Sequence, residues 1–265
     1  MYPAPKLYSI IRQMTKPILD KSKLPKHIAF IVDGNRRWAK ENKLPAYEGH
    51  RRGAQVVLRI IDDCLELGIP VLTFYLFSTE NWKRTKNEVN FLMQLGLNFL
   101  KMKVKDINAK GVRIRGVGRI DELEKSLRDS IHYAEQLTKN NKKMVLNLAI
   151  NYGGRTEIID AVNKILGNKN IKKVHPALPK NKESNTEAKG GVNEETFSKN
   201  LYTAGLPDPD LLIRTSGESR ISNFLLWQIA YAEIVIIPEF WPDLSKEKLY
   251  EAIAEYQKRQ RRWGK

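Results

Sequence analysis

A carboxylate and two arginines follow one another within a few residues near the start of the chain. The segment HIAFIVDGNRRWAK, residues 27–40, is an apolar run that stops at Asp33 and continues, after a glycine and an asparagine, into Arg36 and Arg37. Short runs of β-branched and aromatic residues that end in a turn are typical of strands buried on both faces. The residues after the turn are compatible with a helix, and the first backbone N–H groups of a helix attract anions. The segment therefore predicts an anion site, such as a diphosphate site, at the end of a buried strand.

Asp33 is the unusual member of this group. A lone carboxylate beside an anion repels it unless a divalent cation bridges the two, so the pattern favours a metal-assisted diphosphate site. An ordinary turn followed by solvent-exposed arginines explains this segment equally well when it is considered alone.

Two further polar clusters also follow apolar runs. The run at 71–77 leads into the polar sequence STENWKR. The run at 211–215 contains Arg214 and leads into a segment with Arg220 and several serines. In open parallel sheets, ligands bind at the carboxyl ends of the strands, so these clusters should face the one at Asp33. Arginines combined with hydroxyl groups suit a second phosphate group. Three such strand ends in one sheet are harder to explain as solvated loops than any one of them alone.

The spacing along the chain indicates which elements position these residues. Strand-like apolar runs alternate with segments of helical period, which predicts an α/β fold with a mostly parallel six-stranded sheet flanked by helices. We expect the strands at 27–32, 71–77, 112–118, 144–150, 211–215 and 234–238. We expect the helices at about 50–67, 85–110, 119–138, 154–166, 193–203 and 245–262.

Length and composition bound the number of domains. With 265 residues, of which 42% are hydrophobic and 29% charged, the chain can form one sizeable globular core. We expect a single domain over residues 24–265, preceded by an N-terminal extension over residues 1–23. The Lys- and Asn-rich segment 167–191 has almost no periodicity, so we expect a surface excursion there.

Charge and cysteine content narrow the class of protein. The 46 Lys and Arg against 30 Asp and Glu give a formal charge of +16, which indicates attraction to polyanions, anionic lipid surfaces or phosphorylated substrates without choosing among them. The single cysteine, Cys64, lies in an amphipathic stretch and is expected to pack in the core, which is compatible with a reducing compartment. There is no apolar stretch of 18 residues, and prolines interrupt the start of the chain, so we expect a soluble, cytoplasmic protein.

Common nucleotide and metal motifs are absent from the sequence. There is no GxxxxGK[ST] loop and no GxGxxG turn opening a helix, and the histidines show no metal-ligand spacing. His50, which precedes two arginines, is a candidate phosphate ligand. In the second apolar run Leu76 shares a strand face with Ser78, which gives the polar site an apolar floor.

Together these motifs resemble those of the cis-prenyltransferases, the family of undecaprenyl and dehydrodolichyl diphosphate synthases. The resemblance extends from about Leu24 to the end of the chain, apart from the segment 167–191. The motifs that carry it are DGNRRWA at 33–39, EGH at 48–50, FSTENWKR at 77–84, NYGGR at 151–155, DLLIRTSGESRISNFLLWQIAYAE at 210–233 and the terminal RWG at 262–264.

The resemblance implies a homodimeric α/β protein with an apolar tunnel. Such a protein elongates an allylic diphosphate with isopentenyl diphosphate, forms Z double bonds and uses Mg²⁺. The resemblance also implies association with membranes through the product. The DDxxD motif of the trans-acting enzymes is not expected, and the sequence does not contain it.

The resemblance assigns roles to individual residues. It implies that Asp33, Asn81 and Ser78 are catalytic, that Asp33 and Glu233 hold the metal, and that the end of the chain completes the neighbouring subunit's pocket. The residues implied to bind the substrates are Gly34, Asn35, Arg36, Arg37, Trp38, His50, Trp82, Arg84, Arg214, Arg220, Ser222, Arg262 and Gly264.

Two departures from the family pattern concern the substrate and the product. Ala46 stands where many members carry an arginine four residues before the histidine, which removes one guanidinium from the allylic diphosphate pocket. Leu76 stands where many bacterial members have a small residue, so we expect a product of short to medium length. The residues expected to line the tunnel and set chain length are Leu76, Phe91, Leu95, Phe99 and Met144.

Three alternatives come from other classes of function. A non-catalytic subunit of the family would keep the fold but lose the catalytic loop, whereas Asp33, Asn81 and Arg214 are all present. Nucleic-acid binding would explain the charge, but no RRM-like or zinc-finger signature accompanies it, so nucleic acid is not an expected partner. Branched coupling of short prenyl units, or transfer to another acceptor, would use the same residues and stays open.

Overall fold

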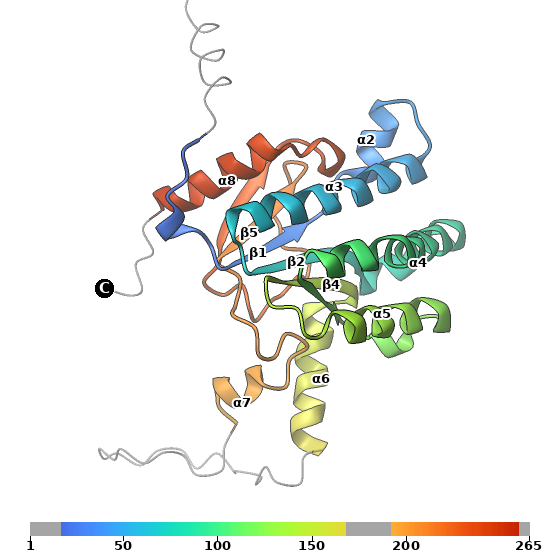
Figure 1. The fold of residues 1–265 in the computed structure, drawn as a ribbon. Helices are drawn as coiled ribbons and strands as arrows, with labels where there is room; N and C mark the ends of the chain where they lie inside the picture. The colour runs from blue at the N-terminus through green and yellow to red at the C-terminus, as the bar shows by residue number, and fades with distance from the viewer. Residues whose placement is uncertain (1–16, 168–191, 260–265) are drawn as a thin grey trace, which may run out of the picture.

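The protein is represented by a computed structural model that describes residues 17–167 and 192–259. The expectations for most of the N-terminal extension, for the segment 168–191 and for Arg262 and Gly264 therefore lie outside the described residues. The remaining parts of the chain are shown in colour in Figure 1.

The described residues contain six strands in one sheet, with the order β3-β4-β2-β1-β5-β6 and parallel pairing throughout (Figure 1). The strands are β1 (His27–Ile31), β2 (Val71–Ser78), β3 (Val112–Val117), β4 (Met144–Tyr152), β5 (Leu211–Thr215) and β6 (Glu233–Ile237). Every residue of β1 and β5 is buried, as expected for inner strands covered on both faces, whereas exposed and buried residues are mixed in the edge strand β3. The predicted α/β fold class is confirmed.

The helices agree with the expected ranges except at three places. The α-helices are α2 (Asn35–Glu41), α3 (Ala46–Leu67), α4 (Lys86–Ala109), α5 (Lys125–Thr138), α6 (Gly154–Gly167), α7 (Glu194–Ser198) and α8 (Lys246–Lys258). Short 3₁₀ turns are η1 (Lys21–Lys23), η2 (Thr79–Lys83), η3 (Ile120–Glu122) and η4 (Trp241–Asp243). The expected helix 119–138 is two elements, because the backbone of Leu123 is extended between η3 and α5. The expected helix 193–203 is helical only over the five residues of α7.

The third difference is the start of α3, which lies four residues before the expected one. Pro45 forms the N-cap in an extended conformation, so the helix begins directly after it. Gly49, the residue directly before the expected start, therefore lies inside α3, where it permits close packing. A Cβ atom on Gly49 would lie 1.9 Å from the carbonyl oxygen of Asn35 at the start of α2.

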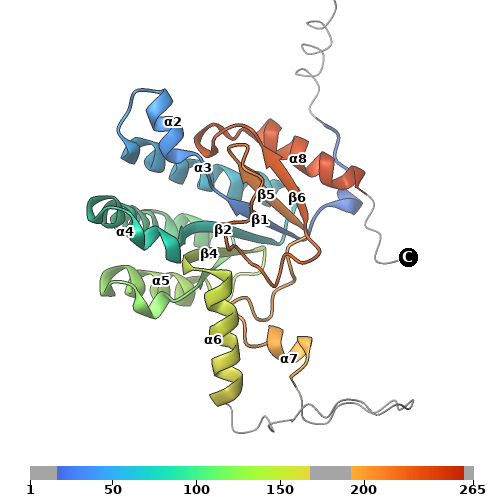
Figure 2. The same ribbon diagram turned by 180° about the vertical axis from the view of Figure 1, so that it is seen from behind.

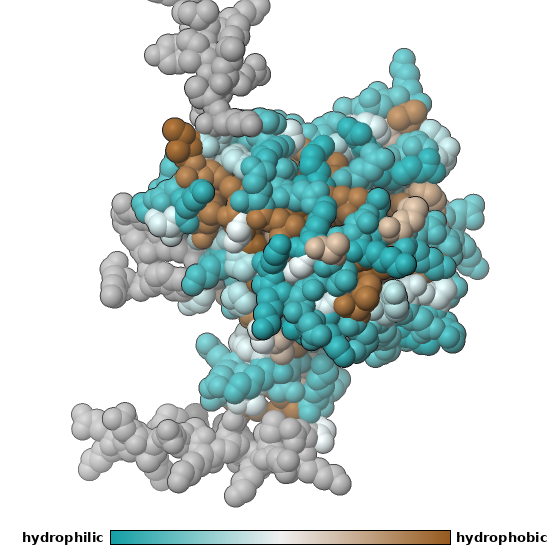
Figure 3. All heavy atoms as spheres, in the orientation of Figure 1, coloured by the Kyte–Doolittle hydropathy of each residue, from teal (hydrophilic) through white to brown (hydrophobic). Residues whose placement is uncertain are grey.

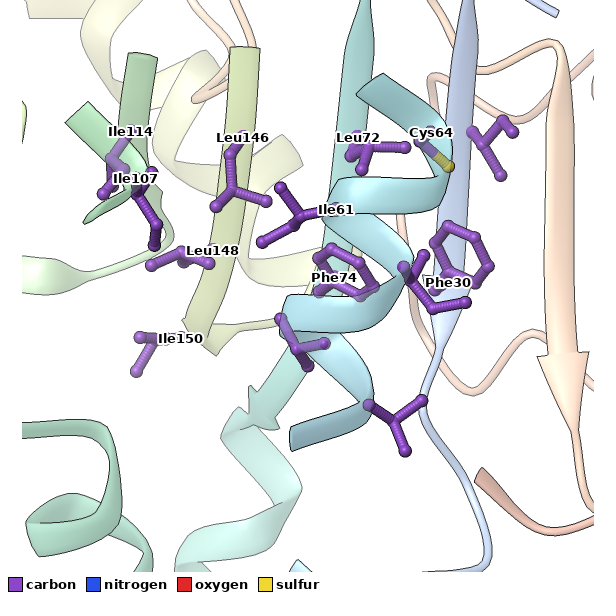
Figure 4. Close-up of a cluster of buried hydrophobic side chains, with 14 of the residues drawn as sticks. Phe30, Ile61, Cys64, Leu72, Phe74, Ile107, Ile114, Leu146, Leu148 and Ile150 are labelled. Atoms are coloured by element: carbon purple, nitrogen blue, oxygen red, sulfur yellow. The ribbon is translucent and has the colours of Figure 1, made fainter. Parts of the chain in front are cut away.

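The larger core lies between one face of the sheet and the helices α3, α4, α5 and α8. Figure 4 shows side chains of α3, such as Ile61, packing against Leu72 and Phe74 of the sheet. Cys64 is buried in this cluster, so its expected place in the core is confirmed. On the outside, Figure 3 shows this helical side as mainly hydrophilic, with hydrophobic residues visible in a broken band across its middle.

The opposite face of the sheet has a thinner cover. Its core is closed by turns of the segment 221–232, in which Phe224 stacks on Tyr75 with 4.4 Å between the ring centroids. Seen from behind in Figure 2, α6 runs away from the sheet and lies beside α7, and these two helices share a small separate cluster of buried residues. No helix among the described residues is long and apolar enough to cross a membrane.

The contact between α2 and α3 generates a prediction about stability. Gly49→Ala should lower the free energy of unfolding by about 1–3 kcal/mol, because the methyl group would press on backbone that cannot rotate away. For a chain of this size the loss corresponds to a melting temperature lower by roughly 2–4 °C per kcal/mol, which calorimetry can measure.

Gly167→Ala is the matched control, since a Cβ atom at the end of α6 would meet nothing within 4 Å. It should leave the melting temperature unchanged or raise it slightly, because alanine favours helix over glycine. Equal effects of the two substitutions would contradict the proposed steric role of Gly49.

Candidate active site

The three polar clusters meet at the carboxyl ends of adjacent strands. Since β2, β1 and β5 are neighbours in the sheet, the loops after them lie side by side. They enclose a cavity of about 580 Å³. The charged and polar residues that line it are Asp33, Asn35, His50, Ser78, Glu80, Asn81, Arg84, Arg214, Arg220, Ser222 and Asn223. A neighbouring cavity of about 570 Å³ shares Asp33, Asn35, His50 and Arg84 and adds Gly34, Arg36, Arg37, Lys40 and Ala46.

Asp33 lies at the centre of this site and is paired with a buried arginine. Its Oδ2 atom accepts a hydrogen bond from Nη2 of Arg214 at 2.7 Å, and the Arg214 side chain is only 4% exposed. Its Oδ1 atom accepts from the backbone N–H of Gly34 at 2.7 Å and lies 3.2 Å from Arg37. Thr215 fixes the backbone, because its hydroxyl donates to the carbonyl of Asp33. Asp33 is thus held by one neighbouring strand, β5, and by the residues at the start of α2.

These contacts determine the charge of Asp33. Partial burial raises the pKa of its carboxyl group, but the hydrogen bond and charge of Arg214, with a further contribution from Arg37, outweigh burial and hold the pKa below its usual range. Asp33 is therefore a carboxylate at neutral pH. A carboxylate has more lone pairs than these contacts use, so it retains the capacity to bind a cation.

Gly34 and the first residues of α2 present the arginines. Gly34 has φ of 102°, and a Cβ atom there would lie 2.7 Å from the ring of Phe240 and 2.9 Å from the hydroxyl of Ser216, so only glycine fits. Arg37 donates to Glu218 at 2.9 Å, and Arg36 lies 3.7 Å from Glu88. Both arginines thus line the neighbouring cavity of about 570 Å³, and each of them also contacts a glutamate of the chain.

Ser78 and Asn81 form a tight turn at the end of β2. The side-chain oxygen of Asn81 accepts a hydrogen bond from the backbone N–H of Ser78 at 3.1 Å. The Ser78 side chain in turn accepts from the backbone N–H of Asn81, which completes a capping box. Both residues line the first cavity, in agreement with their expected place.

His50 lines both of these cavities and also an apolar cavity beside them. Burial lowers the pKa of His50 to about 4, with the positive charge of Arg84 acting in the same direction and Glu88 opposing it. His50 is consequently neutral at pH 7, and its 3.6 Å contact with Glu88 is not an ion pair there. Arg84 donates to the same Glu88 at 3.0 Å, so the carboxylate of Glu88 contacts both His50 and Arg84.

Two tryptophans expected to bind substrate do not line these cavities. The indole N–H of Trp38 donates to Asp243 at 2.7 Å, and that of Trp82 donates to Asn151 at 2.7 Å. Trp82 also packs edge-on against Phe77, with 5.0 Å between ring centroids. In the structure both side chains support the loops around the site.

Glu233 is not brought to Asp33 within one chain. It begins β6, whereas Asp33 follows the end of β1, and in a parallel sheet the amino and carboxyl ends of the strands lie on opposite sides. Its carboxylate is paired with Arg259 at 2.8 Å. A metal role for Glu233 therefore requires a second chain and stays a prediction.

An apolar cavity of about 120 Å³ adjoins the polar one, and Leu76 and Leu92 line both. Leu95 and Phe99 of α4 line the apolar cavity, as expected. Phe91 instead packs on Tyr47, and Met144 is buried at the start of β4, so these two do not line it. The cavity fits the expected apolar tunnel, whose full course stays a prediction.

Sequence reasoning missed the acidic and amide groups that organise the basic ones. Glu88 lies four residues after Arg84, a spacing that indicates a helical ion pair and could have revealed it. Glu218 bridges Arg37 and Arg220, which are far apart in sequence, so no local pattern indicates it. Asn223 also belongs to the site but carries no charge signal.

The described residues contain no group of three or more His, Cys, Asp or Glu side chains that could hold a metal ion. Mg²⁺ is often bound by one or two carboxylates together with substrate phosphates, and the single carboxylate of Asp33 fits that pattern. The residues present therefore suit a metal that arrives with a diphosphate better than a metal held by protein alone.

The chain is similar to proteins of one family along nearly its whole length. A family model described as putative undecaprenyl diphosphate synthase matches residues 31–264. An isoprenyl transferase of Clostridium tetani is 48% identical over 246 residues, which cover 93% of this chain and 91% of that protein. The ditrans,polycis-undecaprenyl-diphosphate synthase ((2E,6E)-farnesyl-diphosphate specific) of Micrococcus luteus is 44% identical, with 93% of this chain and 94% of that protein covered.

Solved structures show the same similarity in three dimensions. Lavandulyl diphosphate synthase from Lavandula x intermedia, in complex with dimethylallyl diphosphate, has a TM-score of 0.83 and 36% identity and covers 92% of this chain and 100% of that one. A probable undecaprenyl diphosphate synthase from Campylobacter jejuni has a TM-score of 0.72 and 33% identity, with 91% and 99% covered.

The buried state of His50 generates a prediction about pH. The folded pKa of about 4 lies below the unfolded value of about 6.5, so the unfolded chain binds more protons between these values. The free energy of unfolding should fall as pH is lowered from 6.5 to 4, by at most about 1.4 kcal/mol per pH unit for this group.

The test is urea unfolding of the wild type and His50→Gln at several pH values. In the variant, the free energy of unfolding should depend less steeply on pH than in the wild type. The part of this pH dependence that is due to His27 should remain, because burial also lowers the pKa of His27 to about 4. His27→Gln is the matched control, because His27 lies at the amino end of β1 and lines none of these cavities. An unchanged slope in His50→Gln would contradict the neutral, buried state of this residue.

Proposed function

The chain belongs to the undecaprenyl diphosphate synthase family and is a prenyltransferase, and we propose that it condenses isopentenyl diphosphate with an allylic diphosphate to give Z-prenyl diphosphates. One observation carries this proposal above the others. A polar cavity with a central carboxylate and several arginines lies beside an apolar cavity, and Leu76 lines both. A substrate with a charged head and an apolar tail fits such a pair of cavities.

The arginines divide between two phosphate groups in this proposal. Gly34, Asn35, Arg36, Arg37 and His50 would hold the allylic diphosphate, because they line the cavity around the start of α2. Arg214, Arg220 and Ser222 would hold isopentenyl diphosphate. The hydroxyl of Ser222 accepts a hydrogen bond from Arg214 at 2.8 Å, so this second group is already organised.

The residues at the end of β2 lie where the two substrates would meet. Departure of the allylic diphosphate leaves a carbon with carbocation character, which the alkene of isopentenyl diphosphate attacks before a proton is lost. Preorganised cations stabilise the charge that develops on the leaving diphosphate. Ser78 and Asn81 would orient the attacking alkene and the departing proton, since their turn lines the cavity beside Asp33.

Mg²⁺ is the cofactor that suits this site. Asp33 would hold it together with diphosphate oxygens, and when bound it supplies further positive charge at the leaving group. The chain's own role is to keep Asp33 ionised and in place, which Arg214 and the backbone N–H of Gly34 accomplish.

A homodimer would complete the site. The thinly covered side of the sheet presents exposed apolar side chains, among them Ile159 and Val162 of α6 and Tyr231 and Ile234 around the start of β6. Glu233 lies between the last two in sequence, so a second chain that covers this surface would bury its surroundings. In this proposal Glu233 and the terminal Arg262 and Gly264 act at a neighbouring subunit, and membrane association follows from the product.

Coupling of short prenyl units is the second candidate function. The apolar cavity of about 120 Å³ is close to the roughly 150 Å³ of an engineered cavity that binds benzene, so it suits a short tail. Similarity to lavandulyl diphosphate synthase points in the same direction. Incubation with labelled isopentenyl diphosphate and each short allylic diphosphate, with and without Mg²⁺, distinguishes the candidates by product length and branching.

Asp33→Asn should reduce prenyl transfer to less than about a tenth of the wild-type rate, a loss above about 1.4 kcal/mol in the barrier. The expected reason is that asparagine keeps an acceptor for Arg214 but removes the charge that binds a cation. Turnover of labelled isopentenyl diphosphate at saturating Mg²⁺ measures the loss.

Asp160→Asn is the control for this experiment. Asp160 forms a two-point hydrogen bond with Arg119 at 2.9 Å, so the substitution weakens a comparable aspartate–arginine pair away from the cavities. Its turnover should stay close to that of the wild type. A rate above a tenth in Asp33→Asn would remove Asp33 from the reaction.

Leu76→Ala should lengthen the product. Leu76 borders both cavities, so its truncation enlarges the apolar space, and each added buried CH₂ favours extension by about 0.8 kcal/mol. Chromatography of the products at equal substrate ratios measures the change. Phe91→Ala is the comparison, because Phe91 packs on Tyr47 outside the cavity lining. A change of product length with Phe91→Ala but not with Leu76→Ala would place the length determinant on α4 and not at Leu76 of β2.

A further inference from the structure

Asn223 joins three segments of the chain that are distant in sequence. Its side-chain nitrogen donates to the carboxylate of Glu80 at 2.8 Å. Its side-chain oxygen accepts from the backbone N–H of Arg155 at 2.9 Å, and its backbone carbonyl accepts from Gly154 at 2.7 Å. One residue thus connects the loop after β5, the turn after β2 and the start of α6.

The conformation and chemistry of this position both require asparagine. Its φ is +63°, in the left-handed region that asparagine tolerates better than most residues. The contacts use the amide nitrogen as donor and the amide oxygen as acceptor, and an ionised carboxylate in the same place has no donor to offer. Gly153 allows the approach, because a Cβ atom there would lie 2.8 Å from the amide nitrogen of Asn223 and 2.6 Å from the hydroxyl of Thr79.

The partner of Asn223 in the turn after β2 is charged. Partial burial raises the pKa of Glu80, but the hydrogen bond from Asn223 and those within the turn outweigh burial and lower it. Glu80 is therefore ionised at neutral pH. Hydrogen bonds to a charged acceptor are roughly twice as strong as neutral ones, so this contact can hold the turn in place.

Each end of the contact is one residue away from a group of the proposed reaction. Ser222 precedes Asn223 and accepts a hydrogen bond from Arg214, which is paired with Asp33. Asn81 follows Glu80 and belongs to the turn that would orient the alkene. The contact between Asn223 and Glu80 is thus a direct side-chain connection between the arginine side and the Asn81 side of the cavity.

We propose that Asn223 is a positioning residue that fixes Asn81 relative to Arg214 through Glu80, and so sets the rate of prenyl transfer more than the binding of either substrate. This inference rests on the proposed function. Displacement of reacting groups by about 1 Å can cost on the order of 100-fold in rate, so the effect should be large even though Asn223 transfers no atom itself.

The test exchanges the donor and the acceptor of the contact. Asn223→Asp keeps an acceptor for Arg155 but loses the donor and places two carboxylates together, so kcat should fall by about tenfold or more. The Michaelis constants for both substrates should change much less. Adding Glu80→Gln restores a donor facing Asp at 223, so the double variant should recover most of the lost kcat. Glu80→Gln alone completes the double-mutant cycle.

Two further variants keep the result interpretable. Glu80→Ala removes the acceptor from an exposed residue, so it should fold and lower kcat in the same way as Asn223→Asp. Asn141→Asp is the control, because Asn141 donates to the carbonyl groups of Asn108 and Val112 at the opposite edge of the sheet. It should lower the melting temperature without lowering kcat.

Several outcomes would overturn the inference. Unchanged kcat in folded Glu80→Ala, absence of recovery in the double variant, or a loss expressed only in the Michaelis constants would each exclude positioning by this contact. These results differ from a failure of the proposed function, in which the wild-type protein itself would transfer no prenyl group from any allylic diphosphate.

Discussion

The ion pair between Asp33 and Arg214 is the contact on which the site depends. Arg214 lies within β5 opposite Ile31, so its buried charge would be unpaired if the end of β1 did not supply a partner. Burying one charge alone is costly, and replacing a buried pair by apolar residues is often neutral or stabilising. The pair is therefore better explained by the chemistry of the cavity than by stability. It also joins the first and third clusters, because Arg214 continues to Ser222.

The remaining cations of the site are held in a similar way by carboxylates of the chain. Glu88 contacts Arg36 and Arg84, and Glu218 contacts Arg37 and Arg220. Such contacts keep long side chains in fixed rotamers, which lowers the entropic cost of binding an anion. A diphosphate that enters must compete with these carboxylates for the arginines. The contacts therefore lower the affinity for the diphosphate while they keep the arginine side chains ordered. The same cations keep His50 neutral, because burial and the neighbouring arginines both oppose its protonation.

The sequence patterns predicted the sheet well because strand runs and their polar ends are local properties. Asp33, Ser78 and Arg214 each follow or end an apolar run, and parallel pairing brings such ends together. Contacts between segments were not predictable in this way. The expected helix start at residue 50 was wrong, and nothing local to Gly49 indicated that it lies inside α3 against the carbonyl of Asn35. Trp38 and Trp82 lie in motifs that carry the family resemblance, which implied that both bind substrate. In the structure their indole N–H groups donate to Asp243 and Asn151 instead. The resemblance named site residues without saying which of them one chain can bring together.

The uneven cover of the sheet explains why one chain does not assemble every residue assigned to the site. Four helices cover one face, where the apolar cavity forms between β2 and α4. The other face is closed by turns of the segment 221–232, and exposed apolar residues such as Tyr231 and Ile159 remain around it. Exposed apolar residues that gather on one side favour association, since burying them releases water. Glu233 begins β6 within this region and is held by Arg259 near the end of α8. Exposed apolar residues that favour a second chain therefore lie next in sequence to the carboxylate that its own chain keeps away from Asp33.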